Sequence, residues 1–232
     1  MKQFDPEKFE IRFQIANAAV EQYEKQGMDF TLKQVAAAAD LEVADIFEYF
    51  PNKREILTFY YEALIVRYRL MLEEIEGFGE YLLAEKLSNF AYTMFDMLEE
   101  HEQFVSDTFR TLIVCSYAKT GFETRVRDLF QEFFTSDERI SVSSSLLVND
   151  IFYKLLYEKF TLLVRFWIRD DSEGREVSME LTDRYTAFLQ EIMYNAVADK
   201  GLELARLLFS DNILGKPFES IRNMFPEIEI RE

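Results

Sequence analysis

The sequence contains few of the residues that build disulfide-linked, metal-binding or β-rich folds. Its 232 residues include one cysteine, one histidine, 7 glycines and 4 prolines. A single thiol cannot form an internal disulfide, and one histidine with one cysteine cannot supply the ligands of a zinc or di-iron centre. We therefore expect a chain without metal or cofactor, whose free thiol fits the reducing cytoplasm.

Long apolar runs are missing too. The most apolar stretch, residues 155–168, is interrupted by Lys159 and Arg165 and is shorter than the roughly 20 residues that span a bilayer. The first residues, MKQFDPEKFE, lack the apolar segment of a secretory leader. Gly-rich phosphate loops and G-x-S-x-G elbows are also absent. We expect no membrane partner, a cytoplasmic location and no enzymatic activity.

The signals of β-hairpins do not occur. Neither Asn-Gly nor Asp-Gly is present, and β-branched residues do not alternate with polar ones. Prolines occur only at positions 6, 51, 217 and 226, so residues 52–216 contain no proline that would break a helix. The sequence therefore predicts an all-α fold.

Caps and apolar periodicity predict the helix positions. Asp5 before Pro6 marks the start of the first helix, Gly27 its end, and Asn52 with Glu55 the start of a long one. The expected helices cover residues 6–26, 32–39, 42–49, 53–75, 80–99, 102–117, 122–134, 146–169, 175–199, 201–209 and 217–224. A polar loop or hinge is expected at residues 136–145.

Residues 31–50 have the pattern of a helix-turn-helix. Thr31 and Gln34 form a capping box, and the alanines that follow allow two short helices to approach closely. The expected small core consists of Val35, Leu41, Ile46 and Phe50. The N-terminal part is therefore predicted to be a three-helix unit.

The run Phe47-Glu48-Tyr49-Phe50-Pro51-Asn52-Lys53-Arg54-Glu55 resembles the Tyr-x-Tyr/His-Phe-x-Ser/Asn-Lys-Glu signature of the TetR family of bacterial transcriptional regulators. The match covers roughly residues 9–60. It implies a DNA-binding domain over residues 1–51 and a ligand-sensing, dimerising helical domain over residues 52–232. The family's activity implies a homodimeric repressor that binds double-stranded operator DNA and is released by a small-molecule effector.

The resemblance also implies which residues meet DNA. Phosphate contacts carry over to Thr31, Tyr49 and Lys53, and Lys53 begins a helix where a cation suits a phosphate. The complete set of candidate DNA-binding residues is Thr31, Lys33, Gln34, Glu42, Asp45, Glu48, Tyr49 and Lys53. Thr31 would cap its helix whether or not it binds a phosphate.

The second short helix is acidic where the family reads bases. Asp40, Glu42, Asp45 and Glu48 lie between residues 40 and 50, and this segment has no basic residue. Carboxylates can accept hydrogen bonds from cytosine amino groups, or can simply stabilise the first turn of the helix. They also repel a polyanion. The sequence therefore leaves two functions open: a DNA-binding regulator, or a TetR-fold sensor or interaction protein that has lost DNA binding.

The C-terminal part offers candidates for a pocket and an interface. Aromatic, sulfur-containing and basic residues on the middle helices suggest a ligand pocket of Phe90, Met94, Phe95, Phe109, Arg110 and Tyr117, although such residues are also typical of a core. The two long helices suggest a dimer interface of Phe152, Leu156, Phe160, Trp167, Tyr185, Phe188 and Ile192. Cys115, inside an apolar run, is expected to be buried, and His101 to be a surface residue.

The net charge of −17 is distributed unevenly. Residues 1–60 hold 7 Lys and Arg against 11 Asp and Glu, so most of the acidic excess belongs to the C-terminal part. Because salt screens exposed charges beyond about 8 Å, acids far from the helix-turn-helix are compatible with DNA binding. The acids at positions 40–48 are the ones that bear on this function.

Overall fold

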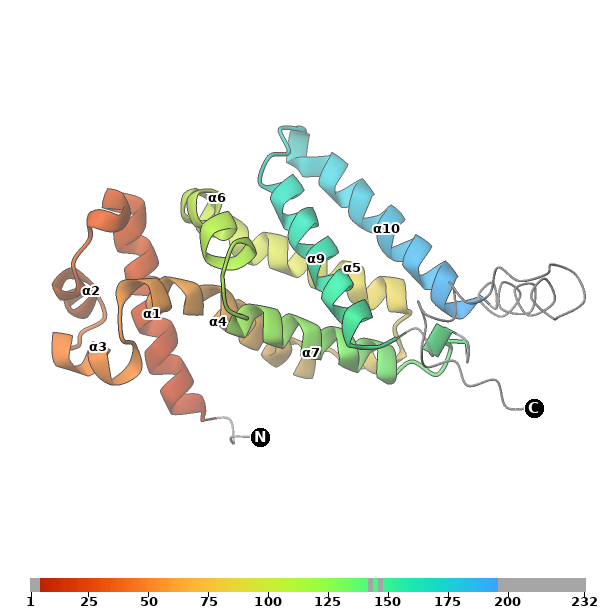
Figure 1. The fold of residues 1–232 in the computed structure, drawn as a ribbon, viewed down its shortest axis with the longest axis horizontal. Helices are drawn as coiled ribbons and strands as arrows, with labels where there is room; N and C mark the ends of the chain where they lie inside the picture. The colour runs from red at the N-terminus through yellow and green to blue at the C-terminus, as the bar shows by residue number, and fades with distance from the viewer. Residues whose placement is uncertain (1–4, 142–143, 146–147, 196–232) are drawn as a thin grey trace, which may run out of the picture.

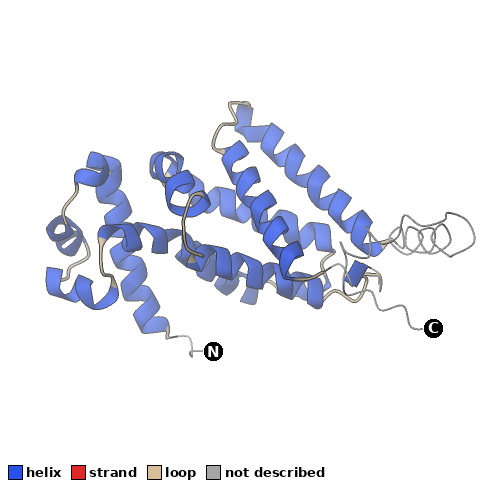
Figure 2. Cartoon of the chain, viewed as in Figure 1, coloured by secondary structure: helices blue, strands red, loops and turns tan. Residues whose placement is uncertain are grey.

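The computed structural model describes residues 5–141, 144–145 and 148–195, and within these the chain forms helices and no strand (Figure 2). The all-α prediction is confirmed. The helices expected at 201–209 and 217–224 lie outside the described residues. None of the described helices combines the length and the apolar character that crossing a bilayer requires.

The first helix has the predicted ends. Helix α1 spans Pro6–Gln26, and the Asp5 side chain accepts a hydrogen bond from the Lys8 amide over 3.1 Å. Gly27 ends the helix with φ at 60°, a left-handed value that costs glycine little. A short 3-10 turn, η1 at Gly27–Asp29, leads to the next helix.

Two short helices follow, α2 at Leu32–Ala38 and α3 at Val43–Tyr49. The predicted capping box is present, because the Gln34 amide donates to Thr31 Oγ1 and the Thr31 amide donates to Gln34 Oε1. Asp40 turns the chain between them with φ at 53°, a region that Asp visits more readily than most residues. Gln14 of α1 donates to the Ala39 carbonyl over 2.8 Å and fixes the turn against the first helix.

Helix α4, Lys53–Glu73, leads from the three N-terminal helices into the rest of the molecule (Figure 1). Its cap is the predicted one, with the Glu55 amide donating to Asn52 Oδ1 over 2.9 Å. Near its start, Phe59 packs against Phe9 of α1 and against Phe50. The rest of α4 packs on the C-terminal helices.

The middle of the chain forms α5 (Leu83–Glu99), α6 (Glu102–Phe109) and α7 (Gly121–Thr135), with a 3-10 turn η2 at Phe78–Glu80 before α5. The helix expected over 102–117 is shorter and changes character: after Phe109 it continues as a π-helix, η3, at Arg110–Val114. Such widened turns are rare and often mark functional segments. The Arg54 guanidinium donates to the Thr111 carbonyl here, so η3 contacts the start of α4.

Two long helices, α9 (Asp150–Trp167) and α10 (Glu176–Tyr194), lie side by side at the end of the molecule away from α3 (Figure 1). A short turn, η4 at Glu173–Arg175, joins them. The inner face of α9 completes an aromatic core: Phe160 packs on Phe90 at 4.8 Å between ring centroids, and Trp167 stacks on Phe95 at 5.3 Å. Such pairs add to the free energy gained by burial.

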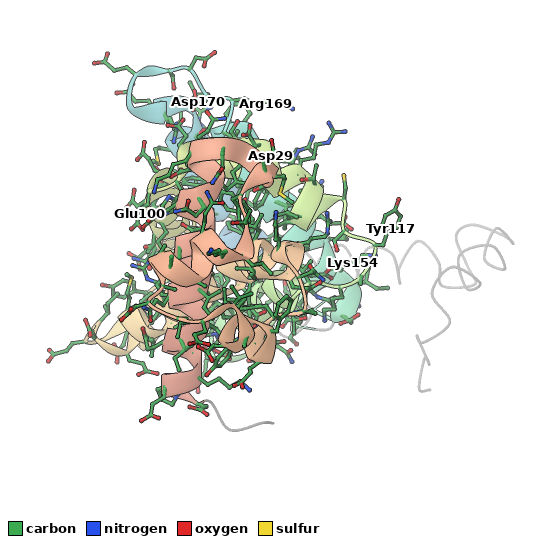
Figure 3. The ribbon with its side chains drawn as sticks, turned by 90° about the vertical axis from the view of Figure 1, so that its left-hand side faces the viewer. Asp29, Glu100, Tyr117, Lys154, Arg169 and Asp170 are labelled. Carbon is green, nitrogen blue, oxygen red and sulfur yellow. The ribbon has the colours of Figure 1, made fainter. Side chains whose placement is uncertain are left out.

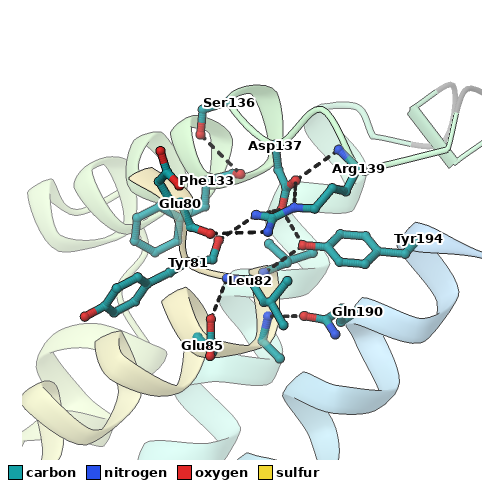
Figure 4. A network of polar contacts seen from close by, with 12 residues as sticks. Glu80, Tyr81, Leu82, Glu85, Phe133, Ser136, Asp137, Arg139, Gln190 and Tyr194 are labelled. Atoms are coloured by element: carbon teal, nitrogen blue, oxygen red, sulfur yellow. Dashed lines mark hydrogen bonds and ion pairs between the residues drawn. The ribbon is translucent and has the colours of Figure 1, made fainter. Parts of the chain in front are cut away.

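A polar network fastens α10 to the start of α5 (Figure 4). Asp137 accepts from Arg139 over 2.7 Å and from the Tyr194 hydroxyl over 2.5 Å. The same hydroxyl accepts from the Leu83 amide, and Gln190 accepts from the Ala84 amide. Side chains of α10 thus accept hydrogen bonds from the first amides of α5. At a free helix end these amides would be bonded to water.

Candidate functional site

Helix α2 presents the first of the predicted DNA-binding residues. Thr31 and Gln34 are exposed but bonded to each other as the capping box, so each has a structural task. Lys33, in the first turn, is exposed. The free amides of this turn, next to a lysine, are of the kind that hold a phosphate oxygen.

Lys53 is less free than the sequence indicates. Its ammonium group donates to the carbonyls of Met28 and Phe30 and lies 4.7 Å from the centroid of the Phe30 ring. It therefore fastens the η1–α2 connection to the start of α4. An ammonium group has three donors, and these two carbonyls leave one of them for a phosphate.

The acids of α3 divide into two groups. Asp45 is half-buried and accepts from the Glu42 amide over 2.9 Å, which stabilises the first turn of α3. Glu42 and Glu48 are exposed. Among the described residues, no ion pair involves an acid between positions 40 and 48. The exposed carboxylate of Glu48, which takes no part in the capping of α3, is therefore open to an external partner.

Two residues that are not among the predicted DNA contacts lie on the same surface. Phe47 is 55% exposed and Ala44 is exposed, while Ile46 and Phe50 are buried. Tyr49 is half-buried at the edge of this surface. Helical spacing could have identified Ala44 and Phe47. When Ile46 and Phe50 face inward, positions 44 and 47 lie on the outer side of the helix.

The structure places the α9 residues of the predicted dimer interface mainly inside the protomer. Leu156, Phe160 and Trp167 are buried within the protomer, where Phe160 and Trp167 belong to the aromatic core, and Phe152 is half-buried against Phe134. The α10 residues Phe188 and Ile192 are exposed, at 62% and 36%, and Tyr185 is half-buried. Helix α9 is apolar on two faces, and most of the predicted interface residues lie on the inner one.

The outer faces of α9 and α10 form an exposed apolar stripe that sequence reasoning largely missed. Its residues are Ile151, Leu155, Leu162 and Phe166 on α9, and Val177, Leu181, Phe188 and Ile192 on α10. The most exposed is Ile151, at 70%. On each helix they recur at intervals of four, seven and four residues, the spacing of one helix face. Exposed apolar side chains that recur along one helix face are typical of an interaction site.

The predicted pocket residues do not converge on one cavity. Phe90, Met94, Phe95 and Phe109 are buried among packed side chains, for example Phe109 against Tyr61. Arg110 is exposed on η3, and Tyr117 projects fully into solvent (Figure 3). The aromatic residues are thus core residues, while Arg110 and Tyr117 lie on the surface.

A depression of about 450 Å³ lies instead between the end of α7 and the start of α9. Its lining consists of Gln131, Phe134, Thr135, Asp137, Ile140, Ser145, Val148, Asn149, Asp150 and Tyr153. Tyr153 is buried and its hydroxyl has no hydrogen-bond partner. Burial raises the pKa of Tyr153, so the hydroxyl stays protonated and able to donate. Unpaired buried hydroxyls are costly unless a ligand or water meets them.

The lone cysteine and histidine differ from expectation. Cys115, expected in the core, is exposed just after η3, because the widened turn ends the helix at Val114. His101 is half-buried: its Nδ1 lies 3.0 Å from Glu24 Oε2 of α1 and its ring packs on Tyr60. It thus joins α1 to the start of α6. Within the described ranges, no cluster of three or more acidic, histidine or cysteine side chains fits a metal ion.

Comparison with known proteins assigns both halves of the chain. The family model described as "Bacterial regulatory proteins, tetR family" matches residues 15–58, and the model "Tetracyclin repressor-like, C-terminal domain" matches residues 86–208. No curated protein matches the chain.

Two solved structures share the fold. A TetR transcriptional regulator from Nitrosomonas europaea is 19% identical with a TM-score of 0.57, and the match covers 76% of this chain and 96% of that one. A tetR-family transcriptional regulator from Streptomyces coelicolor is 15% identical with a TM-score of 0.50, covering 93% and 95%. At these identities the likeness concerns the fold alone.

Proposed function

The chain belongs to the TetR family of bacterial transcriptional regulators, and from this premise we propose that it is a homodimer that binds operator DNA through α2 and α3 and releases it when a small molecule binds. The observation that carries the proposal is the complete helix-turn-helix with an outward-facing α3, formed by the capping box, the Asp40 turn and the Gln14 tether. A domain of α1–α3 with the start of α4 would read DNA, and the remaining helices would sense and dimerise.

The exposed apolar stripe supports the homodimer. Two protomers that join their α9–α10 stripes would form a four-helix bundle, which removes these side chains from water. Dimerisation also brings two copies of α3 to one duplex, where they would fit successive major grooves when about 34–36 Å apart. A ligand that changes this spacing would weaken DNA binding by population shift.

Binding to the DNA upstream of the protein's own gene tests the DNA-binding function. We expect saturable, salt-sensitive binding that Lys33→Ala weakens, because Lys33 is exposed and its loss leaves the fold intact. Lys154→Ala, an equal charge change on an exposed residue of α9, is the control and should bind as the unchanged protein does. Absence of binding at low salt would favour the alternative, a TetR-fold sensor or interaction protein whose acidic α3 prevents DNA contact.

The depression between α7 and α9 is our candidate effector site, because the Tyr153 hydroxyl there lacks a partner. We expect a small molecule that accepts a hydrogen bond from Tyr153. Compounds that raise the melting temperature and release DNA should lose both effects in Tyr153→Phe, which removes only the donor. Tyr81→Phe, a change at an exposed tyrosine outside the depression, is the control. Retention of both effects in Tyr153→Phe would place the effector elsewhere.

A further inference from the structure

The outer face of α3 carries an apolar and acidic surface that packing within the protein does not explain. Ala44, Phe47 and Glu48 are all exposed. The core of the N-terminal unit is completed by Ile46 and Phe50, both buried, so the Phe47 ring adds little to it. Residues three and four apart are neighbours on a helix, so these three side chains form one patch.

Hydrogen-bond chemistry limits what this patch recognises. From Glu42 to Tyr49 the side chains include no Lys, Arg, Asn, Gln, Ser, Thr or His, and only the Tyr49 hydroxyl donates. In the major groove guanine offers only acceptors, which need a donor from the protein. Thymine offers a methyl group and cytosine an amino donor. Adenine also offers an amino donor, but its N7 acceptor lies beside that group and repels a carboxylate. An apolar ring beside a carboxylate therefore suits the thymine methyl group and the cytosine amino group, and it cannot donate to guanine.

We propose that α3 reads pyrimidines, with Phe47 and Ala44 contacting a thymine methyl group and Glu48 accepting from the amino group of a neighbouring cytosine. The inference rests on the proposed function, since it requires that α3 enters the major groove. Ala44 and Glu48 are about 6 Å apart along the axis at 1.5 Å per residue, close to two base-pair steps of about 3.4 Å. Both contacts therefore fall within one short half-site.

Lysines on the neighbouring helices offset the repulsion between Glu48 and the DNA phosphates. Lys33 on α2 and Lys53 at the start of α4 flank α3, and both carry charge toward the DNA backbone in the proposed arrangement. Asp45 is half-buried and accepts from the Glu42 amide through Oδ2, which directs this carboxylate toward the first turn of α3. Glu48 is thereby left as the acceptor beside Phe47.

The experiment selects binding sites from a pool of duplexes with a randomised segment, using the full chain, and then replaces each selected thymine by uracil. Uracil lacks only the methyl group. We expect selected half-sites that contain a thymine and a cytosine no more than two base-pair steps apart, and a loss of affinity of roughly fourfold for each contacted methyl group. Phe47→Ala should discriminate less between thymine and uracil duplexes than the unchanged protein does, because only the Ala44 contact with the methyl group remains.

Glu48→Gln tests the second contact. A glutamine amide pairs with adenine, so the selected base at the cytosine position should change to adenine. Glu10→Gln, the same change at an exposed residue of α1, should leave the selected site unchanged. Circular dichroism of each variant establishes that the fold is kept.

The outcomes separate this inference from the proposed function. Failure to bind any duplex overturns both. Selection of half-sites without a thymine and a cytosine close together, equal affinity of the unchanged protein for thymine and uracil duplexes, or an equal loss in Phe47→Ala on both duplexes overturns the pyrimidine readout alone and leaves the regulator intact.

Discussion

Asp137 shows how much a single residue contributes to this fold. It is the one acidic side chain among the described residues that is buried, and it holds Arg139 and Tyr194 at the junction of α5, α7 and α10. Burial by itself raises the pKa of Asp137, but hydrogen bonds from Arg139 and Tyr194 outweigh this effect and lower the pKa below its ordinary value of 3.8. The folded state therefore favours the ionised carboxylate.

Asp137→Asn should lower the free energy of unfolding by about 2 kcal/mol at neutral pH, because it weakens charge-assisted hydrogen bonds. Because its pKa is lower in the folded protein, Asp137 stabilises the fold at pH values above 3.8. This stabilisation is lost as the pH falls below 3.8. The variant should therefore lose less stability on acidification. Urea unfolding at neutral and acidic pH measures both effects.

Asp128→Asn is the matched control for this substitution. Asp128 is exposed on α7, and its replacement should change stability by less than about 0.5 kcal/mol. Equal effects of the two substitutions would show that the network in Figure 4 adds no stability of its own.

At the scale of elements, α9 illustrates what periodicity predicts and what it does not. Its apolar residues occupy two faces, a buried one that includes Trp167 and an exposed one that includes Phe166. The sequence predicted a long apolar helix, and the structure confirms it. Which face meets the core depends on where α5 and α7 lie, and no pattern within α9 contains that information.

The outer face of α9 gives a prediction about assembly. Leu155→Glu should convert the proposed dimer to a monomer, because it places a charge in the centre of an apolar four-helix contact. Leu70→Glu, the same change at an exposed leucine of α4, should leave the dimer unchanged. Sedimentation velocity distinguishes the monomer from the dimer for each variant. A dimer that survives Leu155→Glu would exclude this stripe as the interface.

Helix α4 determines how the N-terminal unit can fold. Its Phe59 packs on Phe9 and Phe50, and Arg12 lies 3.8 Å from the centroid of the Phe59 ring. A boundary at residue 51 separates these partners. The division at 51 and 52 expected from the sequence therefore cuts through a packed cluster, although α3 does end before it.

A fragment of residues 1–51 should thus be largely unfolded, because it lacks Phe59 and a core of this size is marginal. A fragment of residues 1–75, which includes α4, should be more helical. Circular dichroism with thermal melting measures the difference. A cooperative transition in the shorter fragment would show that α1–α3 fold independently.

At the scale of the whole molecule, charge governs how the protein meets DNA. The net charge is −17, and the cations near α3 are few. If Lys33 and Lys53 each neutralise one phosphate per protomer, a dimer releases counterions from four phosphates. The logarithm of the binding constant should then fall against the logarithm of salt concentration with a slope of roughly −4.

Lys33→Ala should reduce that slope to roughly −2, because two phosphate contacts are lost from the dimer. Binding measured by fluorescence anisotropy over a salt series gives both slopes. An unchanged slope in Lys33→Ala would remove this residue from the DNA contacts.

The sequence by itself determined the all-α class, the approximate positions of most of the described helices, the capping box and the family resemblance. These features depend on residues a few positions apart, so local spacing records them. Only the tertiary structure decided that Lys53 is bonded to two carbonyls, that Cys115 is exposed, and which face of α9 is free. Each of these depends on where another segment of the chain lies, and the free energy of such contacts is set by packing between helices far apart in sequence.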